Sequence, residues 1–440
     1  MKEKENMEKL QKKTWFAIVL ISLVGQIAWT VENMLFNVFI QQEFNAMLND
    51  IALMVSASAF VATITTILIG ALSDKIGKRK LFISFGYIAW GLSIMAFALL
   101  RLETLHDTFY IKASSYFQAA ALGITLTIIL DCVMTLFGSS ANDAAFNAWL
   151  TDITNENNRG KVEGINSAMP LIAVLFVFGF NMLIEKSSSH WQILFIAIGA
   201  LAIIVGIVSL FIVKDKEDIK GEGSYLKNIS YGFRPSVIKE NKVLYIVLLG
   251  FLLFSMSVQV FMPYLILYFT NALKLENYVF IFAPGIILAS IFTFFYGKII
   301  DKIGFFKTSI ISLGIYLVGL LLLTLFTNIV FVFIGTTFTL AGFLSENACF
   351  NSEIRNNTPE KNVGMLQGIR IVVQVLIPML IGPWIGSILS GNTTEGVFGV
   401  AGDGYTPSRF IFLGALAVAL FVIIVIFIYR KGTRKKEEQK

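Results

Sequence analysis

The amino-acid sequence predicts an all-α membrane protein whose twelve transmembrane helices form two pseudo-symmetric six-helix bundles. Three observations support this prediction: an apolar composition, twelve apolar runs of spanning length, and a segment of the first half that recurs in the second. We expect a first bundle over residues 1–213, a cytoplasmic linker over 214–242, a second bundle over 243–429 and a basic cytoplasmic tail over 430–440.

The composition indicates that lipid is the solvent of this chain. Hydrophobic residues make up 56% of the 440 residues and charged residues only 15%, and the mean hydropathy is +0.74. Soluble domains carry about 25% charged residues, so a water-soluble protein is disfavoured. The net charge of +6 does not indicate a nucleic-acid partner, because the basic residues follow the sides of a membrane. The expected partners are therefore the lipid bilayer and a small-molecule substrate.

Twelve apolar runs are long enough to cross a bilayer. A helix needs about 20 apolar residues to span a hydrocarbon core of roughly 30 Å, and within lipid it satisfies its own backbone hydrogen bonds. The runs lie at about 15–40, 51–72, 81–100, 121–149, 161–184, 191–213, 243–270, 278–300, 308–327, 329–351, 363–389 and 409–429.

Lysine and arginine residues mark one side of the expected membrane. Of the 35 such residues, Arg370 lies within an apolar run, and five fall on the outer side: Arg101, Lys112, Lys186, Lys274 and Arg409. All the others lie on the side of the Lys-rich N-terminus. Because cytoplasmic loops carry an excess of basic residues, we expect a multi-pass cell-membrane protein with both termini in the cytoplasm.

The two halves contain a recognisable repeat. Residues 143–164 align with residues 347–368 at an offset of 204, and eight of the 22 positions are identical, where composition alone would give roughly one or two. Duplication of a six-helix unit explains this similarity. Parallel repeats about an axis normal to the membrane, with the solute near the midplane between them, are a recurring architecture of secondary transporters.

A short charged loop also recurs in the two halves. Residues 70–80 read GALSDKIGKRK and residues 297–307 read GKIIDKIGFFK. The first copy matches, at every defined position, the signature loop of the major facilitator superfamily, Gly-x-Leu-x-Asp-Arg/Lys-x-Gly-Arg/Lys-Arg/Lys. The chain therefore resembles that superfamily. The resemblance implies the major facilitator fold and a transporter that moves a small solute by alternating access between its two halves, rather than an enzyme.

The charged loops are expected to contribute to gating on the cytoplasmic side. Gly70 allows a neighbouring helix to approach closely, Gly77 permits a tight turn, and Asp74 can accept from a helix N-terminus or an arginine. Asp152 and Arg159 resemble the second charged loop of the superfamily. The alternative is a plain positive-inside turn. The expected gating residues of these loops are Gly70, Asp74, Gly77, Arg79, Asp152, Arg159 and Asp301.

Two acidic residues inside apolar runs are the candidates for ion coupling. An ionised group at bilayer depth costs about 3 kcal/mol on insertion scales, so each of these acids is expected to have a function or a partner that offsets this cost. Glu32 and Asp131 both lie four or five residues to the outer side of a helix midpoint, about 7 Å from the midplane, and we expect them to share a proton or Na⁺. Trp29, beside Glu32, suits stacking on a sugar or a cation. The alternatives are structural hydrogen bonds for the acids and simple packing for Trp29.

A second group of charged residues lies nearer the inner ends of the helices. Asp143, Glu346 and Arg370 are expected to form an inner gate. Arg370 can pair with Glu346 within the second half, which is favoured and would be structural, or with Asp143 across the halves.

Uncharged polar residues complete the expected solute-binding set. On the fourth helix, Asn142 continues the polar face of Asp131 at helical spacing. Gln259 and Tyr264 share a helix with Pro263, and Gln374 shares one with Pro378; a proline kink with freed carbonyls can shape a cavity.

The absence of several family motifs argues against some classes of transporter. The Arg of the fourth helix and the Gly-Pro pair of the fifth, typical of proton-driven drug antiporters, are absent, as are the Pro-Glu-Ser/Thr motifs of classical sugar porters. The two acids give a weaker resemblance to the glycoside/cation symporter branch, although the second helix lacks the acids of melibiose-type symporters. We therefore expect H⁺- or Na⁺-coupled symport of a sugar, glycoside or similar polar solute.

Two other function classes compete with symport. The 40 Phe residues favour the alternative of a proton-driven exporter of amphipathic drugs or lipid-like solutes. A receptor or membrane-embedded enzyme is disfavoured, because the sequence shows no nucleotide loop, metal-ligand cluster or nucleophile constellation. We expect no cofactor beyond the coupling ion, no metal site and a monomer.

Overall fold

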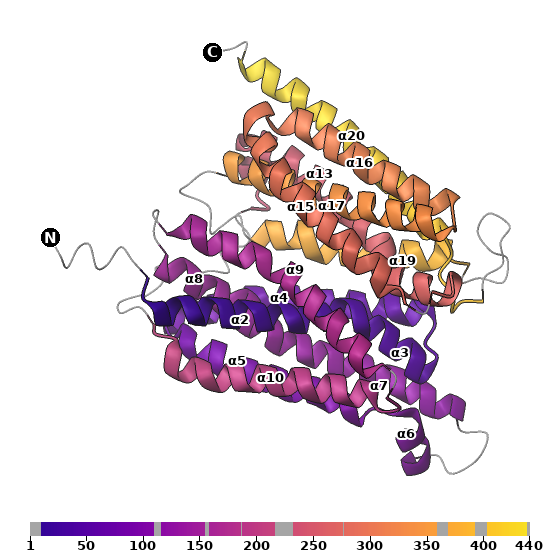
Figure 1. Cartoon of the computed structure of the whole chain (residues 1–440). Helices are drawn as coiled ribbons and strands as arrows, with labels where there is room; N and C mark the ends of the chain where they lie inside the picture. The colour runs from indigo at the N-terminus through magenta and orange to yellow at the C-terminus, as the bar shows by residue number, and fades with distance from the viewer. Residues whose placement is uncertain are drawn as a thin grey trace. The chain divides into compact units, whose positions relative to one another are not determined.

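The computed structural model of the chain describes residues 10–109, 116–154, 158–185, 187–215, 232–275, 277–358, 368–391 and 403–437. Within these ranges the chain is almost entirely helical, and twelve helices are long and apolar enough to cross a membrane (Figure 1). The fold class predicted from the sequence is therefore confirmed. The spans of the first half are Lys12–Phe44, Leu48–Ser73, Arg79–Leu99, Tyr116–Ile153, Gly164–Ile184 and His190–Ile212. Those of the second half are Lys242–Ala272, Val279–Ile300, Phe305–Leu325, Ile329–Asn357, Gly368–Leu389 and Phe410–Thr433.

Several spans are interrupted by π-helical or 3₁₀-helical turns. The elements of the first half are α2 (Lys12–Thr30), η1 (Val31–Leu35), α3 (Phe36–Phe44), α4 (Leu48–Ile76), α5 (Arg79–Ala96), η2 (Phe97–Leu99), α6 (Leu102–Phe109), α7 (Tyr116–Gly138), η4 (Ser139–Phe146), α8 (Asn147–Ile153), α9 (Arg159–Ile184) and α10 (His190–Ile212). Those of the second half are α12 (Pro235–Glu240), α13 (Lys242–Phe261), η5 (Met262–Tyr264), α14 (Leu265–Leu267), η6 (Tyr268–Ala272), α15 (Val279–Ile303), α16 (Phe305–Leu325), α17 (Ile329–Asn357), η8 (Val372–Leu376), α19 (Ile377–Leu389) and α20 (Phe410–Glu437).

The chain divides into two compact units. The first consists of Met1–Ala46 with Phe60–Ser224, and the second of Met47–Ala59 with Tyr225–Lys440. The beginning of α4 thus packs with the second unit, where Ser387 Oγ donates to Asn49 Oδ1 at 2.7 Å and Trp384 Nε1 to Ser56 Oγ at 3.1 Å.

Close helix crossings build the interior of each unit. In the first unit, α5 packs against α10, and a Cβ added to Gly91 would stand 2.4 Å from the Gly199 carbonyl oxygen. In the second unit, α16 packs against α17, and a Cβ on Gly342 would stand 2.4 Å from the Tyr316 nitrogen. Small residues of this kind let helix backbones approach within van der Waals distance, which fixes the positions of the polar side chains nearby.

The repeated segments make the same local contacts in each unit. Asn147 Nδ2 donates to the Asp143 carbonyl at 3.1 Å, and Asn351 Nδ2 donates to the Asn347 carbonyl at 2.8 Å. Both pairs are related by the offset of 204 residues that aligns the two segments. The similarity read from the sequence therefore extends to individual hydrogen bonds.

Candidate transport site

Two acidic side chains lie together in the interior of the first unit. Glu32, in η1, is 8% exposed, and Asp131, on α7, is 2% exposed. The Thr135 hydroxyl, one helical turn after Asp131, donates to Glu32 Oε1 at 2.9 Å, and the two carboxyl groups interact electrostatically. The similar depths expected from the sequence thus bring these two acids into one polar cluster.

One buried oxygen of this acid pair has unused hydrogen-bonding capacity among the described residues. Within the described part of the chain, Asp131 Oδ1 has no hydrogen-bond partner although it is buried. A buried polar group without a partner costs about 1–3 kcal/mol. A proton bound to this carboxyl or a small cation beside it would remove that cost, so the pair is suited to bind either.

Helical irregularities coincide with the polar residues expected to line the site. Glu32 lies in η1, Asn142 and Asp143 lie in η4, and Gln374 lies in η8, all of which are π-helical. A π-helical turn widens the helix and shifts the direction of the following side chains, and such turns are frequent at functional sites. The π-helical turns therefore lie in the same spans as these polar residues.

Three aromatic rings form a cluster that packs against Gly138, about two turns after Asp131 on α7. The Trp29 and Trp90 ring centroids are 5.0 Å apart, and those of Tyr87 and Trp90 are 5.4 Å apart. Gly138 faces Trp90 so closely that a Cβ there would stand 2.7 Å from the indole ring. Among the described residues, the buried Trp90 Nε1 finds no acceptor. It is thus a candidate donor to a polar solute.

Asn142 connects this aromatic cluster to the inner acid Asp143. The Tyr87 hydroxyl lies 3.0 Å from Asn142 Oδ1 and 2.8 Å from the Ile21 carbonyl oxygen. Asn142 Nδ2 donates to Asp143 Oδ1 at 3.3 Å, and Asp143 also lies beside Trp29. Two expected solute-binding residues, Trp29 and Asn142, and one expected gating residue thus belong to a single cluster in the first unit.

Trp90 and Tyr87 were not among the residues predicted to bind a solute. Both lie on α5, where aromatic residues among apolar neighbours are normally packing residues. Their role emerges only from the contact of α5 with α7 and η4. Thr135, by contrast, lies four residues after Asp131 and so shares its helix face.

In the second unit the expected polar residues are not gathered in the same way. Gln259 lies where α13 crosses α19, and a Cβ on Gly382 would stand 2.6 Å from the Cβ of Gln259. Gln374 Oε1 lies 3.4 Å from Nε of Arg370.

Tyr264 differs from its expected role as a solute ligand. It is fully buried, and its hydroxyl lies 2.7 Å from the Pro383 carbonyl oxygen and 3.2 Å from that of Leu48. This geometry makes Tyr264 a packing residue that joins η5 to α19 and the start of α4, because its polar atom is already used within the protein.

The expected ion pair between Glu346 and Arg370 does not form between these two described side chains. The Glu346 carboxyl group is bound by Ser309 and Ser312 of α16, while Arg370 Nη2 donates to Asn351 Oδ1. Asn351 follows Glu346 by five residues, and at about 100° per residue their side chains lie roughly 140° apart around α17. This prediction of pairing was wrong because it considered only the depths of the two residues in the membrane and not the directions of their side chains.

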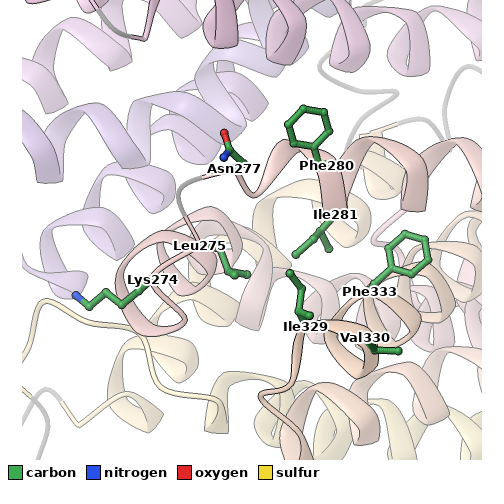
Figure 2. A pocket seen from close by; sticks show the side chains of 8 residues that line it. All are labelled: Lys274, Leu275, Asn277, Phe280, Ile281, Ile329, Val330 and Phe333. Atoms are coloured by element: carbon green, nitrogen blue, oxygen red, sulfur yellow. The ribbon is translucent and has the colours of Figure 1, made fainter.

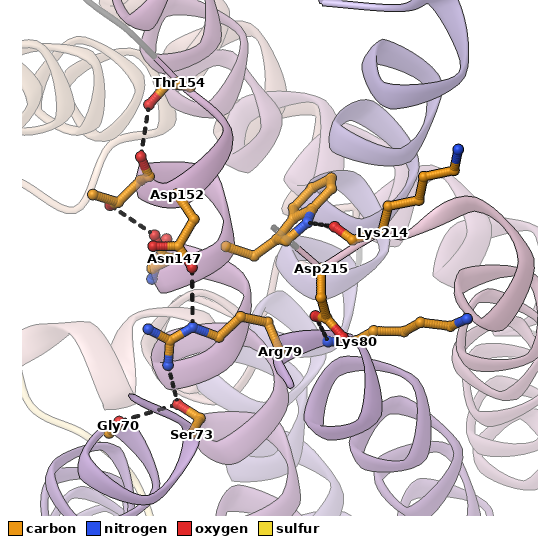
Figure 3. Close-up of polar contacts among 11 residues, drawn as sticks. Gly70, Ser73, Arg79, Lys80, Asn147, Asp152, Thr154, Lys214 and Asp215 are labelled. Carbon is orange, nitrogen blue, oxygen red and sulfur yellow. Dashed lines mark hydrogen bonds and ion pairs between the residues drawn. The ribbon is translucent and has the colours of Figure 1, made fainter. Parts of the chain in front are cut away.

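The charged loop of the first unit forms a compact network (Figure 3). Arg79 Nε forms an ion pair of 3.2 Å with Asp152 Oδ2, and its Nη1 donates to Ser73 Oγ, which in turn donates to the Gly70 carbonyl at 3.0 Å. Gly77 has a φ of +69°, a conformation that L side chains rarely adopt. The side chains of Asp74, Arg159 and Asp301 lie outside the described residues.

The corresponding region of the second unit uses different chemistry. Gly304 keeps the positive φ, at +76°. Arg79 corresponds to Phe306 at an offset of 227 residues, and Arg430 lies 4.3 Å above the centre of that ring. An ion pair in one unit is thus replaced by a cation–π contact in the other.

Solved structures of transporters share this fold. The nucleoside transporter NupG aligns with a TM-score of 0.66 and 12% identity, covering 94% of this chain and 98% of that one. A bacterial homologue of the human lysosomal transporter Spinster gives a TM-score of 0.66 and 15% identity, covering 95% and 96%. The xylose transporter XylE from E. coli gives 0.67 and 13%, covering 94% and 97%.

Sequence comparison supplies the family. No curated protein sequence matches the chain. The family model described as Major Facilitator Superfamily matches residues 18–383, which is well over half of the sequence. The signature loop, the twelve spans and this match lead to one conclusion: the chain belongs to the major facilitator superfamily.

Proposed function

We propose that this membrane transporter is a symporter that works by alternating access and couples H⁺ or Na⁺ to the movement of a small, neutral, polar solute such as a sugar or glycoside. The observation that carries the proposal is the buried pair of Glu32 and Asp131, in which Thr135 of α7 donates a hydrogen bond to Glu32. The superfamily to which the chain belongs consists of transporters rather than enzymes, and the spans make it a multi-pass membrane protein.

The acid pair supports coupling to a cation. Two buried carboxyl groups close to each other cannot both ionise without a strong penalty, so such a pair binds one proton or one cation between its members. Within the described part of the chain, no basic side chain forms an ion pair with Asp131. The missing positive charge is what a coupling ion would supply.

The surroundings of the pair support a polar ring-shaped solute. Trp29, which is partly accessible and packs on the buried Trp90, offers an aromatic face, and Asn142 lies in the same cluster. Ligand sites combine apolar and aromatic walls with a few placed polar groups. NupG and XylE, which share the fold, are a nucleoside and a xylose transporter by name, and both of those solutes are hydroxyl-bearing rings.

The alternative of an exporter for amphipathic solutes rests on the abundance of phenylalanine. Several of these rings lie on exposed helix faces, among them Phe60, Phe85 and Phe294, where a bilayer would cover them. A high phenylalanine content is therefore explained by contact with lipid and does not by itself favour an apolar substrate.

Transport in vesicles tests the proposal. Purified protein in proteoliposomes is given an inward H⁺ or Na⁺ gradient, and uptake of radiolabelled sugars, glycosides and nucleosides is measured. One gradient is expected to drive accumulation of at least one solute. Glu32→Gln and Asp131→Asn should each lower accumulation by about tenfold or more, equivalent to about 1.4 kcal/mol, while leaving solute exchange intact.

A matched control and the opposing results complete the test. Glu103→Gln removes an acid whose side chain is 78% exposed, and it should leave accumulation unchanged. Gradient-driven uptake that is unaltered in both site variants would exclude coupling through this pair. Extrusion of amphipathic dyes, with no uptake of any polar solute, would establish the exporter instead.

A further inference from the structure

A third deeply buried acid lies outside the candidate transport site. Glu346, on α17 in the second unit, is completely inaccessible to solvent. Ser309 and Ser312, one turn apart on α16, bind one carboxyl oxygen each: Ser309 contacts Oε1 and Ser312 contacts Oε2. Neither the proposed coupling pair nor the charged loop uses this group.

The described neighbours of Glu346 carry no compensating positive charge. The titratable groups that face it are Tyr296 of α15 and Cys349 of its own helix, while α16 presents the two serines and α13 packs Phe254 near Phe350. Within the described ranges, no lysine, arginine or histidine forms an ion pair with Glu346. An ionised carboxylate in such a place would be an uncompensated charge in the membrane interior, which is strongly unfavourable.

The hydrogen bonds around Glu346 are compatible with a protonated carboxyl group. A serine hydroxyl donates only one hydrogen bond, and Ser312 Oγ lies 2.9 Å from the Thr308 carbonyl oxygen as well as next to Glu346. Ser312 can therefore donate to Thr308 and accept from a protonated Glu346, while Ser309 donates to the other carboxyl oxygen. One proton on Glu346 satisfies every polar atom of this cluster.

The internal repeat also supports a protonated Glu346. At the offset of 204 residues, Glu346 corresponds to Asn142 of the first unit. Asn142 contacts Tyr87 of α5, just as Glu346 contacts serines of α16. A protonated carboxyl group is the closest equivalent of an amide in size and in having both a donor and an acceptor.

We propose that Glu346 is a second proton-binding site of this transporter, protonated at neutral pH and separate from Glu32 and Asp131. The ligand is a proton held between the carboxyl group and the hydroxyl of Ser312. This assignment does not depend on the coupling proposed for the first unit, and its test requires no transport.

Infrared spectroscopy of the reconstituted protein at neutral pH tests the assignment directly. The difference spectrum of wild type minus Glu346→Gln is expected to contain the C=O band of a protonated carboxyl group. Glu103→Gln, which removes an exposed acid, should instead remove carboxylate bands. Loss of carboxylate bands in the Glu346→Gln spectrum, with no protonated-carboxyl band, would overturn the proposal.

Thermal unfolding provides an independent readout. Glutamine can donate to Ser312 and accept from Ser309 as the protonated acid does, so Glu346→Gln should retain the wild-type melting temperature, whereas Glu346→Leu should lower it. If the cluster held Na⁺ instead, Na⁺ would raise the melting temperature of wild type but not of Glu346→Gln when compared with choline. That result, or a large loss of stability in Glu346→Gln, would contradict a bound proton.

A different observation concerns the surface of the second unit. A groove of about 660 Å³ lies where α15 and α17 begin (Figure 2). Its walls include Phe280, Ile329, Val330 and Phe333, of which the first three are 62%, 54% and 58% exposed. Lys274 and Asn277 belong to the connection before α15. The groove thus combines an apolar floor with a positive charge at the boundary of the spans Lys242–Ala272 and Val279–Ile300.

We infer that this groove binds a phospholipid of the surrounding bilayer. An acyl chain would cover the exposed apolar side chains, and the lipid phosphate would complement the Lys274 ammonium group. Anionic headgroups are attracted to basic residues at the membrane surface, and a lysine at the end of a span extends its charge toward the headgroups. Charge complementarity and position together therefore favour a phospholipid over a free anion.

Photocrosslinking tests this site. Protein in phosphatidylglycerol vesicles containing a phosphatidylglycerol with a photoreactive acyl chain should be labelled in the segments 277–283 and 329–333. Val330→Trp should fill the groove and remove this labelling. Val318→Trp, at a 46% exposed position of α16, should not.

The role of the charge is tested with Lys274→Gln. This variant should lower labelling by the anionic lipid but not by an uncharged photoreactive diacylglycerol, whereas Lys298→Gln should change neither. Labelling spread evenly over exposed helix faces, or unchanged in Val330→Trp, would show that the groove holds no specific lipid.

Discussion

The Thr135 hydroxyl donates a hydrogen bond of 2.9 Å to Oε1 of Glu32, and this bond joins α7 to the π-helical turn η1. The bond holds one buried carboxyl group against the helix that carries the other, Asp131. This hydrogen bond therefore helps to set the position of Glu32 relative to Asp131.

Removing that hydroxyl should change the affinity of the acid pair for the coupling ion. Thr135→Val keeps the shape of the side chain but removes this donor to Glu32 Oε1. A hydrogen bond to an ionised carboxyl group favours the ionised form, so loss of the donor should raise the affinity for a proton. For H⁺ coupling, we expect the H⁺ concentration for half-maximal uptake to fall by roughly tenfold. Thr127→Val is the control, because Thr127 is equally buried on α7 but donates to the Gly123 carbonyl of its own helix. Equal effects of the two variants would contradict a specific role for Thr135.

Adding a methyl group at Gly25 should disturb the solute site. Its Cβ would stand 2.5 Å from Asn142 Oδ1 and 2.6 Å from the Tyr87 hydroxyl, so the polar cluster must shift. Overpacking of this kind costs about 1–3 kcal/mol, and we expect Gly25→Ala to lower both solute affinity and melting temperature. Gly179→Ala is the matched helical control, since nothing lies within 4 Å of its added Cβ. Wild-type affinity in Gly25→Ala would mean that the cluster does not contact the solute.

Breaking the ion pair of Arg79 and Asp152 should destabilise the first unit. The side chains are 6% and 16% exposed, and removing one partner of a buried pair costs about 3 kcal/mol. Arg79→Gln should therefore lower the melting temperature clearly, and the Arg79→Gln/Asp152→Asn double variant should be more stable than the sum of the two single losses. Arg101→Gln breaks a surface pair with Glu103 and should cost less than about 1 kcal/mol. Additive losses in the double variant would show that the two side chains are not coupled.

Asp403 makes a contribution to stability that depends on pH. Burial alone would raise the pKa of Asp403, but hydrogen bonds from the Thr406 and Tyr405 backbone and the Thr406 hydroxyl outweigh it and lower that pKa. A lowered folded-state pKa stabilises the protein above the unfolded-state value of about 3.9, and this stabilisation is lost as the pH falls through the folded-state pKa. Asp403→Asn should thus melt earlier than wild type at pH 7 but not in strong acid. A difference that is independent of pH would contradict this mechanism.

The spans were predictable because their signal is local. A bilayer demands about 20 apolar residues in succession, and any helix that meets this demand shows it in its own sequence. The turns η1, η4, η6 and η8 were not predictable, because a shift of one residue in the backbone hydrogen bonds leaves hydropathy unchanged. They become visible only through the contacts that stabilise them.

The depths of the candidate-site residues in the membrane were predictable from the sequence, but the directions of their side chains were not. Counting residues along helices placed Glu32 and Asp131 at one level, and the structure brings them together. The same counting paired Glu346 with Arg370, whereas Glu346 faces Ser309 and Ser312. Trp90 has no signal at all in an apolar helix until α5 is packed against η4. Rotation about a helix axis depends on its neighbours, which a single sequence does not reveal.

The π-helical turns have a consequence for how the gene can change. A turn closed by i→i+5 bonds holds one residue more than a regular turn, so deleting a single codon within Val31–Leu35 would restore an ordinary helix. Because the restored turn makes the same rotation about the helix axis with one residue fewer, the side chains of Phe36–Phe44 would keep their directions. A deletion of three nucleotides at this turn would therefore remove one residue of η1 and leave the rest of the span in register.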